Sequence, residues 1–295
     1  MLVLKTHLTI RKSNNNSMKL LSQVLITSFL FTWLTSCEQP DPKFGIRTGD
    51  SLFFADRYWE IKKYETSLMG PGPNYFSTDP NHVWVDTKGR LHMTISNRDG
   101  RWFATEVVST DTMGYGTYTF TVLGDLVNIP ENITLGLFTW DNNTFLEEAN
   151  SEVDIEFSKW GDTSSNQTLH YAVQPVAFGP VFEERMENAH VEDFNVFNGT
   201  STHQFTWTPN KITWSSYRGE KVDDKQQIAS WEFDDSNPAR IKYENGVESK
   251  PIVIPKPGRT TNTRINFWVQ TWINIGPSDG EEYEIMVTDF RYKSL

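Results

Sequence analysis

The segment 151–157 reads Ser-Glu-Val-Asp-Ile-Glu-Phe, with acidic and apolar residues in strict alternation. Successive side chains of a β-strand point to opposite faces, so this pattern predicts a strand with one apolar face and one acidic face. The residues expected to face a hydrophobic core are Val153, Ile155 and Phe157. Those expected on the opposite face are Glu152, Asp154 and Glu156. Such a strand belongs to a sheet that rests one face on a core.

The same two-residue period continues on both sides of this segment. Strands or hairpins are expected at 83–96, 116–122, 133–140, 168–174, 203–217, 264–272 and 283–292. Helical periodicity is nearly absent, and only Glu183 to Phe194 is expected to form a short turn of helix. Many short strands separated by turns predict an all-β fold, a jelly-roll β-sandwich of two antiparallel sheets. Because no linker divides residues 51–295, we expect them to form one domain.

The composition fits a large folded domain. The chain has 295 residues, 37% hydrophobic and 14% aromatic, so it can bury a sizeable core. Its formal net charge of −11 disfavours nucleic acid as a partner, because phosphates need a basic surface. A single cysteine excludes an internal disulfide and a cysteine-based zinc site. Eleven tryptophans exceed the usual need of a core, and the surplus is expected to line a sugar-binding surface.

The N-terminal residues have the layout of an export signal. Residues 19–36 place a lysine before an apolar run and end on small residues, as in a secretory signal peptide. The run is shorter than the about 20 apolar residues of a membrane-spanning helix. Residues 34–37, Leu-Thr-Ser-Cys, resemble a bacterial lipobox, so Cys37 is expected to carry a lipid. The alternative is an ordinary signal followed by an incidental cysteine.

This layout sets the expected boundaries and location. Residues 1–36 are the expected signal peptide, with Met18 as the expected true start. Residues 37–50 are polar and proline-rich and are expected to tether the folded domain to the lipid. We therefore expect the protein in the cell envelope, anchored to a membrane only by its lipid and either periplasmic or surface-exposed.

Three carboxylic acids on one strand face suggest a specific chemistry. Neighbouring carboxylates resist ionising together, so at least one of the three is expected to hold a proton near neutral pH. A protonated acid beside a carboxylate is what the hydrolysis of glycosidic bonds requires. Strand positions i and i+4 lie about 13 Å apart at Cα, and this spacing alone does not decide which pair acts or with which stereochemistry. The alternative is a solvated acidic face without a catalytic role.

The sequence also resembles a known family. Glu-Val-Asp-Ile-Glu at 152–156 is similar to the E-x-D-x-E signature of glycoside hydrolase family 16, which includes laminarinases, lichenases and agarases. Further segments resemble the family's strands in the same order. They are 74–77, 82–91, 115–118, 135–140, 203–217, 264–268 and 286–292. The resemblance thus extends through most of residues 74–292.

The resemblance implies a retaining endo-glycosidase that hydrolyses a β-linked polysaccharide of the β-glucan or galactan class in a concave cleft. It implies that Glu152 is the nucleophile, that Glu156 is the general acid/base and that Asp154, between them, tunes their protonation. It implies no required cofactor; a structural calcium is expected at most, with Asp289 at the matching position. The chain departs from the family at Asn150-Ser151, where the family usually has glycine before the first glutamate.

Strand parity extends the expected cleft to neighbouring segments. Amide, imidazole and indole groups on the acidic side suit a sugar, which stacks on rings and hydrogen-bonds at its rim. The residues expected to bind sugar are Trp140, Trp160, His170, Gln174, Asn266 and Trp268. The alternatives are that His170 is a structural histidine and that the tryptophans pack under a loop. By contrast, Trp207 and Trp214 are expected in the core.

These observations leave three functional readings. The first is a monomeric, lipid-anchored enzyme whose partner is its polysaccharide substrate. The second is a carbohydrate-binding lipoprotein of the same fold without catalytic activity. The third is a structural sandwich domain in which the acidic face is only solvated.

Overall fold

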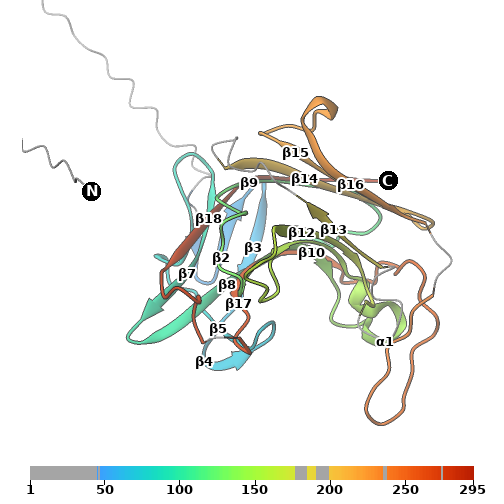
Figure 1. Ribbon diagram of the computed structural model, residues 1–295, viewed down its shortest axis with the longest axis horizontal. Coiled ribbons are helices and arrows are strands. Elements are labelled where there is room, and N and C mark those ends of the chain that lie inside the picture. Colours follow the sequence, from blue (N-terminus) through green and yellow to red (C-terminus); the bar gives the residue numbers. More distant parts are fainter. Residues whose placement is uncertain (1–44, 46, 177–184, 191–198, 235–237, 274) are drawn as a thin grey trace, which may run out of the picture. The chain divides into compact units, whose positions relative to one another are not determined.

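Two layers of antiparallel strands make up the fold (Figure 1). The computed structural model describes residues 45, 47–176, 185–190, 199–234, 238–273 and 275–295. Among these residues, no helix has the length and apolar character needed to cross a membrane. The expected all-β jelly-roll sandwich is confirmed.

The first sheet carries the acidic strand. Following its hydrogen-bonded neighbours, its strands are β13 (Met186–His190), β12 (Gln167–Val173), β11 (Val153–Ser158), β10 (Ile133–Trp140), β17 (Asn262–Val269), β8 (Arg101–Ser109), β3 (Arg57–Ile61), β2 (Ser51–Phe54) and β1 (Arg47–Thr48). The acidic strand β11 therefore has a hydrogen-bonded strand on each side. Its register is fixed from both edges.

The second sheet packs behind the first. Its strands, in neighbour order, are β6 (Val83–Val85), β7 (Leu91–Arg98), β18 (Tyr283–Ser294), β9 (Gly116–Leu123), β14 (Thr200–Trp207), β15 (Ile212–Arg218) and β16 (Gln227–Phe233). Pairing of β7 with β8 joins the two sheets, and β4 (Tyr64–Met69) and β5 (Asn74–Phe76) extend from this junction. Within the described ranges, the short helices are α1 (Phe145–Glu148) and the 3₁₀ turns η1 (Ala149–Ser151) and η4 (Asp224–Gln226).

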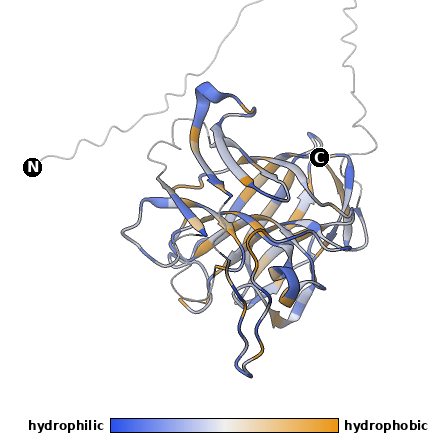
Figure 2. Cartoon of the chain, turned by 90° about the vertical axis from the view of Figure 1, so that its right-hand side faces the viewer, coloured by the Kyte–Doolittle hydropathy of each residue, from blue (hydrophilic) through white to orange (hydrophobic). Residues whose placement is uncertain are grey.

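The core lies between the two sheets, as the alternation predicts. Val153, Ile155 and Phe157 are fully buried on the core side of β11. From the second sheet, Trp207 and Trp214 are also buried, as expected. Figure 2 shows hydrophobic residues interspersed along the strands and mostly hydrophilic residues in the loops that project from them. The apolar faces of both sheets thus meet, and the acidic face of β11 points away from the core.

One expected element is wrong. The segment from Glu183 to Phe194 does not form a turn of helix over its described part, because Met186–His190 is the strand β13. This strand pairs with the free edge of β12, whose backbone groups need hydrogen-bond partners. The edge of an existing sheet thus overrides the weak local preference of the segment. The rest of the segment lies outside the described residues.

Candidate active site

The acids of β11 lie in cross-strand rows that the sheet register defines. Glu156 stands opposite Gly136 of β10 and His170 of β12. Asp154 stands opposite Phe138 and Ala172. Because all three acids share one face, the rows place them together on the open side of the first sheet.

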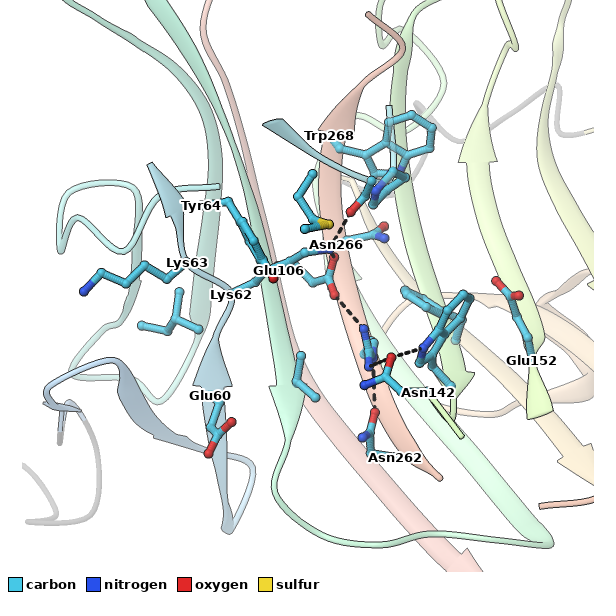
Figure 3. Close-up of a pocket in the computed structure, with 18 of the residues that line it drawn as sticks. Glu60, Lys62, Lys63, Tyr64, Glu106, Asn142, Glu152, Asn262, Asn266 and Trp268 are labelled. Atoms are coloured by element: carbon cyan, nitrogen blue, oxygen red, sulfur yellow. Dashed lines mark hydrogen bonds and ion pairs between the residues drawn. The ribbon is translucent and has the colours of Figure 1, made fainter. Parts of the chain in front are cut away.

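A cleft of about 820 Å³ covers this face, and all three acids line it. Its walls come from strands that are distant in sequence. They include Trp140 of β10, Asn266 and Trp268 of β17 and Glu106 of β8. Figure 3 shows several of these side chains around the cleft, with Glu152 across from Lys62. A solvated flat acidic face is thus not what the structure shows.

The three acids hold protons more tightly than ordinary carboxyls do. Burial first, and then the neighbouring charge of Asp154, together raise the pKa of Glu156 to about 8. Burial also raises the pKa of Asp154 to about 7, against a hydrogen bond from Gln174 that lowers it. The pKa of Glu152 is raised by burial and by the charges of Asp154 and Glu156, whereas Arg264 lowers it. The site can therefore hold a proton at neutral pH, as a general acid must.

The turn before Glu152 holds an unusual backbone conformation. Ala149, Asn150 and Ser151 have φ values of 49°, 59° and 54°, a left-handed region that favours glycine. Hydrogen bonds hold this turn: the Asn150 amide donates to the carbonyl of Asp141, and the Ser151 hydroxyl donates to the carbonyl of Lys256. These bonds explain how Asn150-Ser151 can stand where the family usually has glycine. The strained turn delivers Glu152 into the cleft.

Two residues that were expected to bind sugar, His170 in β12 and Gln174 just after it, form hydrogen bonds with other residues of the protein. The Gln174 side chain donates to Oδ2 of Asp154 at 3.1 Å, so it positions the central acid. The His170 ring is buried and engaged at both nitrogens. Nε2 donates to the carbonyl of Ser158 at 2.8 Å, and Nδ1 lies 2.7 Å from Oδ1 of Asn188. His170 thus supports the sheet beside Glu156 through contacts with its neighbours.

The expected tryptophans occupy different places. Trp140 and Trp268 line the cleft. Trp160 is 41% exposed and contacts Trp268 with ring centroids 6.5 Å apart. Trp272 is 62% exposed, and its ring centroid lies 5.8 Å from that of Trp268. The structure therefore places one tryptophan at each side of the acids and adds an exposed indole pair next to Trp268.

Asn266 fits a ligand contact. It is 5% exposed and lines the cleft, and its Oδ1 atom has no hydrogen-bond partner among the described residues. A Cβ atom on the facing Gly136 would lie 2.5 Å from that oxygen. Glycine at 136 therefore makes room for the Asn266 amide between Glu156 and Glu106, where the oxygen can accept a hydrogen bond from a sugar hydroxyl.

A buried ionic cluster on the cleft wall was not predicted. Glu106 is 1% exposed; it pairs with Nζ of Lys62 at 2.7 Å and with Nη1 of Arg264 at 3.3 Å. Arg264 also lies 5.4 Å over the ring of Trp140. Arg264 lies two residues before Asn266 and therefore on the same strand face, so the alternation could have predicted its place in the cleft. Nothing in the sequence indicates that Arg264 pairs with Glu106 or that Glu106 pairs with Lys62.

The expected metal and lipid positions are not tested by the site geometry. The Asp289 carboxylate accepts a hydrogen bond from Nε of Arg291 at 2.6 Å. Over the described ranges, no group of three or more histidine, cysteine or acidic side chains could hold a metal ion. The calcium expectation stays a prediction, and no chemical step below uses it. Cys37 lies outside the described residues.

Solved structures with the same fold include glycoside hydrolases. A β-glucanase of Bacillus licheniformis is 18% identical with a TM-score of 0.51, covering 86% of this chain and 96% of that one. A Bacteroides ovatus family 16 protein of a mixed-linkage glucan locus, solved with its G4G4G3G product, is 12% identical with a TM-score of 0.55, covering 85% and 98%.

A third likeness is to an immunostimulatory antigen and pseudo β-1,3-glucanase of Mycobacterium tuberculosis. It is 14% identical with a TM-score of 0.54, covering 85% of this chain and 94% of that one. No protein-family model matches the chain, and the search of curated proteins gave no match. These likenesses show that the chain has the fold of family 16 β-glucanases.

Proposed function

We propose that this protein is a retaining endo-glycosidase that hydrolyses a β-linked polysaccharide, with a β-glucan as the first candidate and a galactan as the second. The observation that carries the proposal is the set of three acids on one strand face, which lines a cleft and binds protons tightly. The β-glucanase fold of the chain supports the choice of a β-glucan.

In the proposed reaction, Glu156 donates its proton to the glycosidic oxygen as that bond breaks. The Glu152 carboxylate attacks the anomeric carbon from the opposite side and forms a glycosyl-enzyme ester. Water then attacks the same carbon and gives a proton to Glu156, while the ester bond to Glu152 breaks. Each cycle returns Glu152 to its ionised form and Glu156 to its protonated form, and the product keeps the anomeric configuration.

Asp154 and Asn266 support these steps. The Gln174 amide holds Asp154 between the two glutamates, where its charge raises the pKa of Glu156 and so keeps the acid protonated. The free Oδ1 atom of Asn266 is available for a sugar hydroxyl. The residues that line the cleft come from several neighbouring strands, and we propose that they bind an internal stretch of a polymer, which suits endo cleavage.

The test is product analysis over a panel of laminarin, mixed-linkage β-glucan, agar and carrageenan. We expect oligosaccharides of intermediate length from at least one polymer, retention of configuration by NMR and loss of turnover in Glu152→Gln and Glu156→Gln. Azide should rescue cleavage by a Glu152→Ala variant as an inverted glycosyl azide. No product from any polymer, with an active control enzyme in parallel, would refute the proposal.

A second candidate is carbohydrate binding without catalysis, which the likeness to a pseudo β-1,3-glucanase favours. Affinity electrophoresis in gels that contain each polymer separates the two. Retardation of wild type and Glu152→Gln alike, together with no turnover by wild type, would indicate a binding protein. Trp268→Ala should abolish retardation in either case, because Trp268 lines the cleft.

We further propose that Cys37 carries a lipid that anchors the protein in the cell envelope. The lipobox-like residues 34–37 support this placement. Labelling of expressing cells with a palmitate analogue should mark the wild type and not Cys37→Ser. Equal labelling of both would refute the anchor.

A further inference from the structure

Glu152, the residue before β11, and Glu156, within β11, are spaced symmetrically about Asp154, so the order of the acids does not by itself decide which glutamate is ionised. Glu152 and Glu156 each stand two residues from Asp154 on the same face. Burial raises the pKa of both glutamates. The two roles in the proposed reaction, however, are opposite. Something outside β11 has to distinguish the two glutamates.

The backbone of Arg264 stands in the row of Asp154, level with neither glutamate, so Arg264 breaks this symmetry through the direction of its side chain. The row of Glu152 continues across β10 at Trp140 and across β17 at Asn262, because Trp140 and Asn262 are register partners. Arg264 directs its guanidinium into that row. Nε donates to Oδ1 of Asn262 at 3.2 Å, and the group lies over the Trp140 ring.

Two further contacts hold the guanidinium in place. Nη2 donates to Oδ1 of Asn142 at 3.5 Å, and Asn142 is itself held by the indole N–H of Trp140 at 2.7 Å. Nη1 pairs with the buried Glu106. The Arg264 side chain is 13% exposed. Figure 3 shows two of these partners, Asn142 and Asn262, between Glu106 and Glu152. The contacts of Arg264 with Asn262, Trp140 and Asn142 draw its guanidinium toward the Glu152 end of the cleft, whereas Glu106 holds it from the row of Glu156.

The other charged groups around the acids do not favour ionisation of Glu152 over ionisation of Glu156. Lys62 and Lys63 lie on the opposite wall, where Lys62 pairs with Glu106 and Lys63 with Asp50. On the Glu156 side, His170 of β12 is engaged by Ser158 and Asn188. Besides Glu152, the acidic groups that line the cleft are Glu60, Glu106, Asp154 and Glu156.

We propose that Arg264 is a positioning residue that distinguishes the two glutamates: its cation stabilises the ionised form of Glu152 and so directs the shared proton towards Glu156. The inference deepens the proposed function and rests on it for its catalytic meaning. Burial and the charges of Asp154 and Glu156 raise the pKa of Glu152 well above its ordinary value, and Arg264 acts against this rise. A unit charge about two strand spacings away moves a pKa by about one unit at an effective dielectric near 20.

Carboxyl titration by ¹³C NMR tests this without any substrate. The signals of Glu152 and Glu156 are assigned with the Glu152→Gln and Glu156→Gln variants. In Arg264→Met, we expect the midpoint of Glu152 to rise by about one pH unit and that of Glu156 to move by less than half as much. Arg264→Lys should stay close to wild type because it keeps the charge. Arg291→Met, on β18 of the second sheet, is the matched control and should leave both midpoints unchanged.

Equal movement of both midpoints in Arg264→Met, or movement of neither, would overturn the proposal. If Arg264→Met does not fold, because Glu106 loses one of its two partners, Arg264→Met with Glu106→Gln replaces it, and the same shift of Glu152 is required. The pH profile of kcat/KM is measured in parallel. Its acidic limb should move up by about one pH unit in Arg264→Met and return in Arg264→Lys, whereas a merely structural role would lower the rate at all pH values alike. A wild type that shows the titration pattern but no turnover would refute the proposed function and not the role of Arg264 in ionisation.

Discussion

Neutralising Glu156 should make the fold more stable, and increasingly so as the pH rises. The carboxyl has an ordinary pKa of 4.5 and a folded pKa of about 8, raised first by burial and then by Asp154. A group whose folded pKa is raised binds more protons in the folded state. The stabilising contribution of Glu156 to the free energy of unfolding is fully present below about pH 4 and is lost as the pH rises through about 8.

The size of this effect follows from the two pKa values. At about 1.4 kcal/mol per pH unit, ionised Glu156 destabilises the fold by about 4 kcal/mol at pH 8 and by less than about 1 kcal/mol at pH 5. Glu156→Gln keeps the shape and removes the charge. We therefore expect its free energy of unfolding to exceed that of wild type by about 4 kcal/mol at pH 8, or about 10 °C in Tm, and to match wild type within about 1 kcal/mol at pH 5.

Urea unfolding at pH 5, 6, 7, 8 and 9, followed by tryptophan fluorescence, measures the difference. Glu60→Gln is the matched control, because Glu60 lines the same cleft but is exposed. We expect no pH-dependent difference between this control and wild type. If Glu156→Gln and wild type have parallel stability curves from pH 5 to 9, Glu156 is not a proton-binding group in the folded state, and its assignment as general acid fails.

Three further predictions concern the cleft. Asp154→Asn should lower the pKa of Glu156, because the Asp154 charge raises it, so the basic limb of the pH profile of kcat/KM should move to lower pH; an unchanged limb would contradict this. Gly136→Ala should displace the Asn266 amide, cost about 1–3 kcal/mol of stability and raise KM severalfold, as calorimetry and kinetics can show; a wild-type KM would mean that Asn266 does not bind sugar. Trp272→Ala should weaken binding of long oligosaccharides more than of short ones, because its exposed ring extends the surface beside Trp268; equal affinity at all lengths by titration calorimetry would exclude that role.

The parts of the site that could be predicted are those that depend on local alternation. The faces of β11 follow from its two-residue period, and the burial of Ile155 and the cleft position of Asp154 agree with it. Parity within β17 likewise placed Asn266 and Trp268 on the cleft side. These predictions need only the strand itself and the knowledge of which face is apolar.

The parts that could not be predicted depend on the order of strands. Glu106 meets Lys62 and Arg264 only because β8 lies between β3 and β17, and nothing in the three segments states that order. One partner of His170, Asn188, comes from β13, which pairs with a sheet edge that the sequence does not reveal. The left-handed turn at 149–151 could not be predicted because it contains no glycine and is held instead by side-chain hydrogen bonds.

The register of β11 has a consequence for how samples of this protein can be judged. A slip of one residue against β10 would turn Val153, Ile155 and Phe157 to the cleft and bury three carboxylic acids between the sheets. Each uncompensated buried charge would cost several kcal/mol, which exceeds what a marginally stable fold tolerates. A molecule that folds with β11 in the wrong register is therefore not an accessible state. We expect every folded molecule in a sample to carry all three acids in the cleft.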